Sequence, residues 1–294
     1  MMTARTRVQA TLKKILFATD FSPAAEKAEA FLTGLAKHFS CEIQILHVLD
    51  LSGLFKAPDA GISIEAARRA AEEKLAAIEA QLAGGGIKAK AILSEGLEPA
   101  KEILQVANEN SADLIVVGTR GLSALGRLAL GSVTQQLIHH AECPVFTTGP
   151  NVKTPQPQPK FQRIVCTTDF SEDATKAIQL ALPFTQSYDA HMFLCHVLPK
   201  PDPSHPIDAQ KLNEKFKAEL KRLIPSVASE WCEPECVVDH GYAADGIRLL
   251  ANRVKADLII LGARRSSHWF TNLKAGIAFE VIRAAECPVM TIRG

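Results

Sequence analysis

The sequence predicts an α/β protein made of two similar domains, each built on a largely parallel sheet with helices on both faces. Two observations lead to this prediction. Four short segments of the first half return in the second half in the same order, and each half alternates buried apolar runs with helical patterns. Strands that alternate with helices are typical of parallel sheets, because each crossover places a helix against a face of the sheet.

The internal repeat establishes the domain organisation. The repeated pairs are 14–22 with 163–171, 46–49 with 195–198, 112–118 with 256–262, and 141–145 with 285–289. Their offset changes only from 149 to 144 residues, so one domain was duplicated along the chain. The segment between the copies has alternating prolines, which favour an extended and semi-stiff backbone. We therefore predict domains at 1–149 and 161–294, joined by a linker at 150–160.

Local signals place the elements of the first half. Ser22 and Pro23 are typical of an N-cap and a first helical position. The run Gly84-Gly-Gly86 is expected to end a helix. The expected strands are 13–19, 42–49, 87–94, 113–118 and 144–148, and the expected helices start after Ser22 and cover 62–83, 97–110 and 131–140.

Composition and charge exclude several classes of protein. The chain has 33 Lys plus Arg against 32 Asp plus Glu, a net charge of +1, which argues against nucleic acid or an anionic membrane as the main partner. No apolar run approaches the length of a membrane span, and the start has no signal-peptide pattern, so a cytoplasmic location is expected. The 7 cysteines are scattered and are expected to be reduced core residues.

The segment from Gly118 to Ser132 has the composition of a phosphate-binding loop. It holds glycines at 118, 121, 126 and 131, starts where a strand ends, and finishes where a helix starts. Glycine lets backbone N–H groups approach an anion, and a helix N-terminus adds unpaired donors and partial positive charge. Arg120 and Arg127 add cations within local reach. The spacing matches neither the Walker pattern nor the dinucleotide fingerprint.

This loop resembles the G-x-x-G-(nine residues)-G-[ST] motif of the universal stress protein family, at Gly118, Gly121, Gly131 and Ser132. The resemblance extends to the segments starting at Ala18, Leu46 and Cys143, and it covers both halves of the chain. It implies two tandem doubly wound domains of the adenine nucleotide alpha hydrolase type, each with five parallel strands in the order 3-2-1-4-5. Strands 1 and 4 would then flank the crevice where such sheets bind ligands.

The resemblance also implies an ATP site, with magnesium, in the first domain. Asp20 corresponds to the acidic residue beside the adenosine, and the Val48 backbone to the adenine contact. The remaining positions line the pocket, contact ribose and phosphates, or cradle the triphosphate. With the two arginines added from the loop itself, the expected site comprises Ala18, Asp20, Val48, Val117, Gly118, Arg120, Gly121, Arg127, Gly131, Ser132 and Val133.

The second half keeps little of this motif. Gly262 is retained, but Arg265 replaces Gly121, while Ala275 and Gly276 replace Gly131 and Ser132; Trp269 and Phe270 add bulk. Asp169 and Val197 persist, although strand ends alone can account for them. We expect this half to bind ATP weakly or not at all. An alternative is that Arg264 and Arg265 hold a different anion.

Four features also admit purely structural interpretations. Asp20 can cap the first helix together with Ser22. His47 and His196 follow the second strand of each copy and are expected to be structural. The cluster Cys232, Cys236, Asp239 and His240 suggests zinc, but alternate residues of a strand point to opposite faces, so no metal is expected. The mixed charges of 65–79 are expected to face solvent.

The sequence leads to an ATP-binding regulatory protein of the stress response, with an unidentified protein partner. The loop between Gly118 and Ser132 contains no Asp, Glu or His that could activate water, so no catalytic residue is assigned. Two alternatives stay open. One is a scaffold that needs no ligand; the other is a slow ATPase or self-phosphorylating protein with Ser132 or Thr119 as acceptor. The resemblance further implies pairing of the two copies within one chain, or a homodimer.

Overall fold

The computed structural model describes residues 12–52, 63–119, 130–155, 159–200, 209–226, 228, 232–263 and 276–293. Its contacts divide the chain into two compact units, one ending at Pro159 and the next beginning at Lys160. Each unit is an α/β domain with its own buried core.

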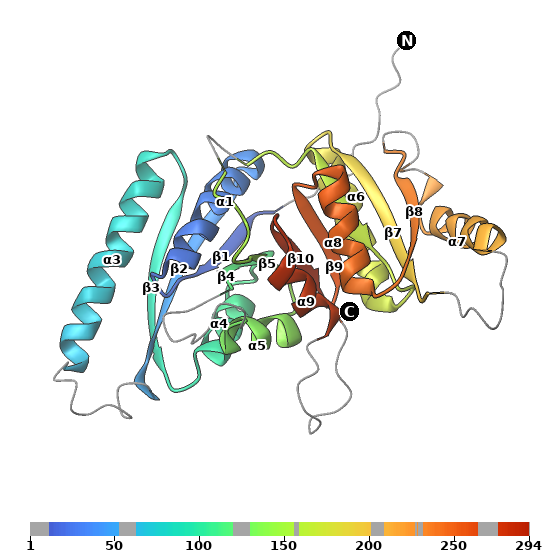
Figure 1. The fold of residues 1–294 in the computed structure, drawn as a ribbon. Coiled ribbons are helices and arrows are strands. Elements are labelled where there is room, and N and C mark those ends of the chain that lie inside the picture. The colour runs from blue at the N-terminus through green and yellow to red at the C-terminus, as the bar shows by residue number, and fades with distance from the viewer. Residues whose placement is uncertain are drawn as a thin grey trace, which may run out of the picture. The chain divides into compact units, whose positions relative to one another are not determined.

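The first domain alternates strands and helices along the chain (Figure 1). Its elements are β1 (Lys14–Ala18), α1 (Pro23–Phe39), β2 (Glu42–Asp50), α3 (Ile64–Gly84), β3 (Ala89–Gly96), α4 (Pro99–Glu109), β4 (Leu114–Gly118), α5 (Ser132–His140) and β5 (Val145–Thr148). The strands are parallel and neighbour one another in the order β3-β2-β1-β4-β5. The predicted fold class and the implied strand order 3-2-1-4-5 are confirmed here.

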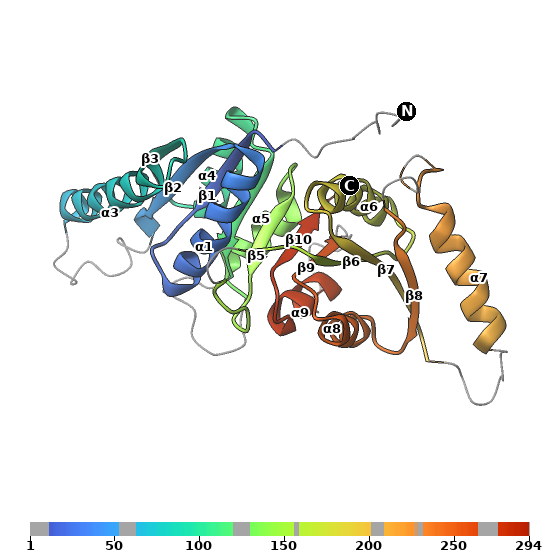
Figure 2. The same ribbon diagram turned by 90° about the horizontal axis from the view of Figure 1, so that it is seen from above.

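The second domain repeats this arrangement. Its elements are β6 (Arg163–Thr167), α6 (Glu172–Ser187), β7 (His191–Leu198), α7 (Ala209–Arg222), β8 (Glu235–His240), α8 (Ala243–Val254), β9 (Leu258–Gly262), α9 (Ile277–Ala284) and β10 (Val289–Ile292). The parallel strands follow the order β8-β7-β6-β9-β10, which is again 3-2-1-4-5 within the domain. In Figure 2, α8 and α9 lie on the side of this sheet opposite α6.

Helices cover both faces of each sheet. In the first domain α1 contacts β1, β4 and β5, and α3 contacts β2 and β3; α4 packs on β2 and β3 and against α5. The central strands β1 and β4 are buried almost throughout, as expected for parallel strands covered on both faces. Phe17 and Phe146 are among the largest fully buried side chains of this core.

The predicted helix signals act as expected. The Ser22 hydroxyl accepts the N–H of Ala25 at 3.3 Å, and Pro23 is the first residue of α1. Ser63 and Ser171 cap α3 and α6 in the same way. The glycine run ends α3 with Gly85 as C-cap, and Gly86 has φ +78°, a left-handed angle that glycine adopts without strain.

An aspartate before the fourth strand explains one of the repeated segments. The Asp113 carboxylate accepts the backbone N–H groups of Lys13 and Lys14 at 2.7 and 2.9 Å. Asp257 accepts the N–H groups of Gln162 and Arg163, both at 2.9 Å. In each domain, therefore, this carboxylate joins the start of the first strand to its neighbour in the sheet. The Ala-Asp-Leu-Ile repeat serves the fold.

All seven cysteines are free thiols, and five of them are buried. Burial raises the pKa of the Cys143 and Cys41 thiols to about 11, so both remain protonated near neutral pH. The expectation of reduced core cysteines agrees with this arrangement. Within the described part of the chain, no helix combines the length and apolar character that a membrane crossing needs.

Candidate functional site

Five of the eleven sequence-predicted site residues lie at the carboxyl ends of three adjacent strands. Ala18 ends β1, where it lies beside Leu46 of β2 and Val117 of β4. Asp20 follows β1, Gly118 ends β4, and Val48 lies near the end of β2. The parallel topology thus brings these positions to one edge of the sheet, at the point where the strand order reverses.

Asp20 has a structural role in this position. Its Oδ1 atom accepts the backbone N–H of Ser22 at 3.1 Å, and the Thr19 hydroxyl accepts that of Phe21 at 3.0 Å. These bonds shape the turn between β1 and α1, in which Phe21 has a left-handed φ of 59°. In the second domain Asp169 accepts the Ser171 N–H at 3.0 Å in the same way. The turn therefore accounts for this aspartate in both copies.

Gly118 is required by packing between β4 and α1. A Cβ atom on Gly118 would lie 2.6 Å from the carbonyl carbon of Ala24 and 2.8 Å from the nitrogen of Ala25. Gly262 has the same relation to α6, where a Cβ atom would lie 2.6 Å from the Ala174 nitrogen. Glycine at the end of the fourth strand thus permits close backbone approach in both domains, whatever else it contacts.

Two hydrogen bonds hold the start of α5 beside the end of β4. The Thr134 hydroxyl donates to the Gly118 carbonyl at 3.0 Å, and the Gly131 N–H donates to the Thr119 carbonyl at 2.9 Å. The first intrahelical bond runs from Gln135 to Gly131 at 3.0 Å. Both ends of the predicted phosphate loop are therefore held together at the same edge of the sheet.

The N-terminus of α5 has the features of an anion site. Gly131 is the N-cap, with φ −60° and ψ 142°, so no side chain occupies the capping position. Helix geometry leaves the N–H groups of the first turn without intrahelical acceptors, and the helix dipole adds positive character. The Gly131 N–H is already bonded to Thr119, so the donors for an anion are those from Ser132 and Val133 onward. Ser132 is exposed.

Three of the predicted site residues, Arg120, Gly121 and Arg127, lie outside the described residues. The remaining eight are all brought to the carboxyl edge of the sheet or to the start of α5. Thr119, the second phosphate acceptor considered from sequence, is 2% exposed and its hydroxyl donates to the Thr148 carbonyl at 2.9 Å. Of the two candidate acceptors, only Ser132 is accessible.

A histidine and a phenylalanine form a pair that sequence analysis did not connect. The Nδ1 atom of His47 is 2.8 Å from the Thr19 carbonyl, and the His47 ring lies 4.4 Å from that of Phe21. The ammonium group of Lys74, a residue of α3, lies 5.1 Å from the centre of the Phe21 ring. The second domain repeats the pair with His196 and Phe170. The repeated Asp-Phe-Ser and His-Val motifs are the signal that could have revealed it.

The environment of His47 makes it a poor catalytic acid. Burial lowers the pKa of its imidazole, and the hydrogen bond to Thr19 and the charge of Asp20 oppose this only in part; the charge of Lys74 lowers it further. A neutral ring donating from Nδ1 to the Thr19 carbonyl fits these contacts. The expected structural role of His47 agrees with this geometry.

A pH dependence of stability follows from His47. Its folded pKa lies below the ordinary value of 6.5, so the unfolded chain binds the proton more readily. The contribution of His47 to the free energy of unfolding should therefore be fully present above pH 6.5. It should decrease as the pH drops from 6.5 toward the folded pKa. Urea unfolding across this range should show a shallower dependence on pH for His47→Asn, whose amide nitrogen corresponds to Nδ1 and can donate to the Thr19 carbonyl. Identical slopes for the variant and the parent protein would contradict the assignment.

A hollow of about 520 Å³ opens between α1 and α3 beside the end of β1. It is lined by Thr19, Phe21, Glu26, Glu29, Ala30, Thr33, Lys74, Ala77, Ile78 and Gln81. Burial raises the pKa of Glu29 here, and neighbouring Glu26 adds to the effect. None of these residues belongs to α5 or β4, so the hollow does not include the described ends of the predicted phosphate loop.

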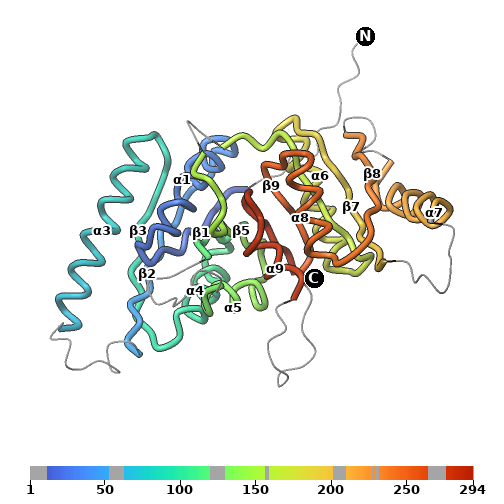
Figure 3. The backbone as a smooth tube through the Cα atoms, viewed as in Figure 1, coloured from blue at the N-terminus to red at the C-terminus, as the bar shows by residue number. Residues whose placement is uncertain are grey.

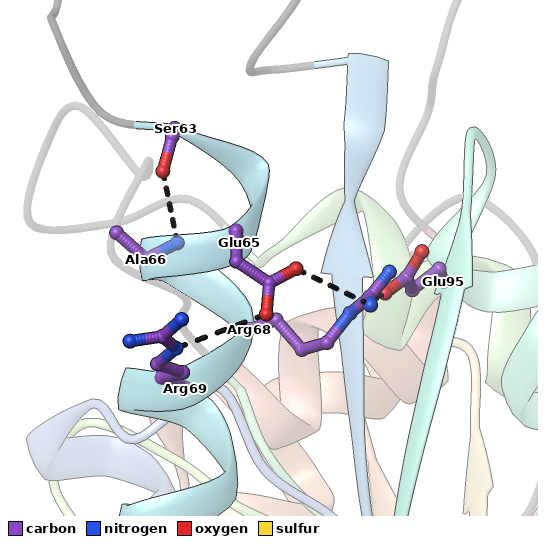
Figure 4. A network of polar contacts seen from close by, with 6 residues as sticks. All are labelled: Ser63, Glu65, Ala66, Arg68, Arg69 and Glu95. Atoms are coloured by element: carbon purple, nitrogen blue, oxygen red, sulfur yellow. Dashed lines mark hydrogen bonds and ion pairs between the residues drawn. The ribbon is translucent and has the colours of Figure 1, made fainter.

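Ion pairs engage two arginines at the start of α3 (Figure 4). Arg68 Nε lies 2.7 Å from Glu95 Oε1 of β3, and its guanidinium is 3.5 Å from Glu65. Arg69 lies 3.7 Å from Glu65. The hydrogen bond to Glu95 raises the pKa of Arg68. These cations are thus paired with carboxylates, and helix 65–79 has the mixed solvent-facing charge expected of it.

The cluster Cys232, Cys236, Asp239 and His240, weighed above as a zinc site, does not form a metal-binding group in the structure. His240 Nε2 is 2.8 Å from the amide oxygen of Asn213, and the Asp239 carboxylate accepts the backbone N–H of His240 at 2.8 Å. No group of three or more metal-ligating side chains occurs among the residues that the structure describes.

The second domain begins its final helix differently. Its loop residues Arg264, Arg265, Trp269, Phe270 and Ala275 lie outside the described residues. Gly276, which aligns with Ser132, is the N-cap of α9 rather than its first helical residue. The helix therefore starts one position later than α5 does relative to the repeat. A helix that starts one residue later has its first free N–H groups about 1.5 Å further along the helix axis.

Comparison with known families agrees with this architecture. The model of the universal stress protein family matches residues 11–148 and, a second time, residues 160–293. The chain belongs to the universal stress protein family. Each match coincides with one of the two structural units, so the chain contains two domains of this family in tandem.

Individual relatives support the family assignment. A universal stress protein of Methanocaldococcus jannaschii is 34% identical over 137 residues, which cover 46% of this chain and 80% of that protein. The protein YxiE of Bacillus subtilis, also a universal stress protein, is 36% identical over 144 residues, covering 45% and 96%. A solved universal stress protein of Archaeoglobus fulgidus has a TM-score of 0.75 at 24% identity, covering 96% and 97%, which shows the shared fold.

Proposed function

We propose that the first domain binds ATP, with magnesium, and that the protein is a cytosolic regulator in the stress response whose nucleotide occupancy is read by a partner protein. The α5 N-terminus is the observation that carries this proposal. It begins at a glycine with no side chain in the capping position, and it is held beside the reversal point of the strand order. Polyphosphates suit such a site because backbone donors and the helix dipole both favour negative charge.

The other residues of the site fit an adenine nucleotide. The N–H groups of Ser132 and Val133 would hold phosphate oxygens, and the Ser132 hydroxyl would add a further donor. The Asp20 carboxylate is partly buried at this edge of the sheet, and a carboxylate can accept several hydrogen bonds, which suits the hydroxyl groups of a ribose. Val48 would offer its backbone to the adenine. Arg120 and Arg127 would add charge toward the phosphates.

The same residues favour holding ATP over hydrolysing it. A hydrolytic site needs a group that orients water and accepts its proton. No Asp, Glu or His occurs between Gly118 and Ser132, and the nearby His47 is engaged with Thr19. A regulatory role follows, because a slowly consumed ligand can set the state of the domain for as long as it stays bound.

Thermal unfolding with and without magnesium and ATP tests the proposal. ATP at 100 times its dissociation constant should stabilise the first domain by about 2.7 kcal/mol. For a domain of this size that is a rise of roughly 5–10 °C in melting temperature. An unchanged melting temperature at millimolar ATP, together with nucleotide-free purified protein, would leave a ligand-independent scaffold. Released phosphate, or a phosphate on Ser132 detected by mass spectrometry, would instead indicate an ATPase or a self-phosphorylating protein.

A further inference from the structure

The chain that follows β5 lies against α1 of the first domain at two places. The Lys27 ammonium donates to the Pro150 carbonyl at 3.4 Å, and Val152, two residues further along, is 2% exposed. Further along, the ring of Pro159 contacts Gly34. Figure 3 follows the yellow-green chain as it leaves β5 and passes beside α1.

Both contacts fall on one side of the helix. Lys27 and Gly34 are separated by seven positions, which is about two turns of α-helix, so they lie on the same face. The described residues on both sides of 156–158 therefore lie against the same face of this helix. A flexible linker without affinity for α1 would not be expected to contact the same helix face twice.

Gly34 is the position that admits the proline. A Cβ atom built there would overlap the Cγ and Cδ atoms of the Pro159 ring. Gly34 is buried in the interior of α1, and its φ is not in the left-handed region that calls for glycine. Glycine inside a helix is destabilising compared with alanine, because it loses more freedom on folding. The contact with Pro159 supplies the physical reason for this otherwise unfavourable residue.

The duplication separates this contact from the demands of the fold. With the repeat offset of 149 residues, Pro183 of α6 is the residue of the second copy that aligns with Gly34. The second copy therefore builds the same helix without a glycine here. The first copy, which the linker follows, is the one that carries glycine at this position.

We propose that the face of α1 formed by Lys27 and Gly34 is a docking surface for the interdomain linker. The linker residues Pro150, Val152 and Pro159 are then part of the first domain. On the other side Phe161 is 1% exposed and packs edge-on against Tyr188, with ring centroids 5.1 Å apart. Each domain anchors its own end of the connection, and Lys160 is the residue left between the two anchors.

Limited trypsin digestion of the full chain tests the docking. The linker contains two trypsin sites, Lys153 and Lys160. In Gly34→Ala the new methyl group should displace Pro159, and cleavage at these two sites should accelerate at least about fivefold, since proteolysis follows the population of the undocked form. The α1 helix itself should hold, because alanine is the better helix former.

Two further variants make the result specific. Gly84→Ala also replaces a helical glycine, but its Cβ atom would meet nothing within 4 Å, so its cleavage should match that of the parent protein. Pro159→Ala removes the docking group from the linker side and should accelerate cleavage as Gly34→Ala does. Unchanged cleavage in Gly34→Ala overturns the proposal. So does a lower melting temperature with unchanged cleavage, because the helix rather than the linker would then have yielded.

Discussion

Replacing Gly131 with aspartate is expected to weaken ATP binding at least about tenfold, which is about 1.4 kcal/mol of binding free energy. An aspartate at the N-cap accepts the N–H groups of the first turn, which are the donors proposed for the phosphates. Its carboxylate also places a negative charge where the triphosphate would lie. The backbone angles of Gly131, φ −60° and ψ 142°, are open to any residue, so the helix start can keep its geometry.

Gly131→Asp should change ATP binding without destabilising the domain. Aspartate is a good N-cap and favours the positive end of the helix, so the melting temperature without nucleotide should stay level or rise. Gly276→Asp is the matched control, since Gly276 is the N-cap of α9 with φ −59° and ψ 160°. It should leave the ATP affinity of the full chain unchanged. Isothermal titration calorimetry measures all three proteins.

Two outcomes would count against the proposed site. Equal ATP affinity in Gly131→Asp and in the parent protein would place the nucleotide elsewhere. A loss of affinity in Gly276→Asp as large as that in Gly131→Asp would assign binding to both domains. The second outcome would also contradict the expectation that the altered loop of the second half binds ATP weakly or not at all.

The fold was predictable from the sequence because its signals are local. The Ser22-Pro23 pair starts α1, the glycine run from Gly84 ends α3, and each apolar run forms a buried strand. Boundaries differ by one or two residues, as at β3, which covers Ala89–Gly96 instead of 87–94. Strand order depends on contacts between distant segments, so it came from the family resemblance and not from the residue pattern.

The site was less predictable, because one residue can satisfy the fold and a ligand together. The resemblance assigned Gly118 to ribose and phosphate, yet packing against Ala24 already requires glycine there. Asp20 was assigned to the adenosine, and it also shapes the turn before α1. The hydrogen bond from the Gly131 N–H to the Thr119 carbonyl joins residues at the two ends of the loop. Because of this bond, the backbone donors for an anion are those of the residues after Gly131. No spacing rule along the chain indicates such contacts.

The duplicated domain helps to separate the two kinds of requirement. Asp20 and Asp169 make the same turn, and Gly118 and Gly262 permit the same close packing. These features persist in the second copy although its loop has changed, and the turn and the close packing give a structural reason for them in both copies. Gly131 and Ser132 are different, because their counterparts are Ala275 and Gly276. The loop and the start of α5 are therefore the strongest support for the proposed ATP site.

The packing role of Gly118 leads to the second large effect. Gly118→Ala is expected to lower the free energy of unfolding of the first domain by about 1–3 kcal/mol in the absence of nucleotide. The added Cβ atom would lie 2.6–2.8 Å from backbone atoms of Ala24 and Ala25, which are far closer than normal contacts. No flexible side chain can move aside to relieve the overlap, so α1 and β4 must separate.

Gly262→Ala should produce a similar loss in the second domain, because its Cβ atom would meet the backbone of Asp173 and Ala174 at 2.6–2.9 Å. Gly276→Ala is the control, since no atom lies within 4 Å of its Cβ position. Urea unfolding without nucleotide measures the three variants. If Gly118→Ala were as stable as the parent protein and lost only ATP binding, the packing explanation would be wrong. Glycine at the end of β4 would then belong to the nucleotide site alone, and its presence at Gly262 would need another cause.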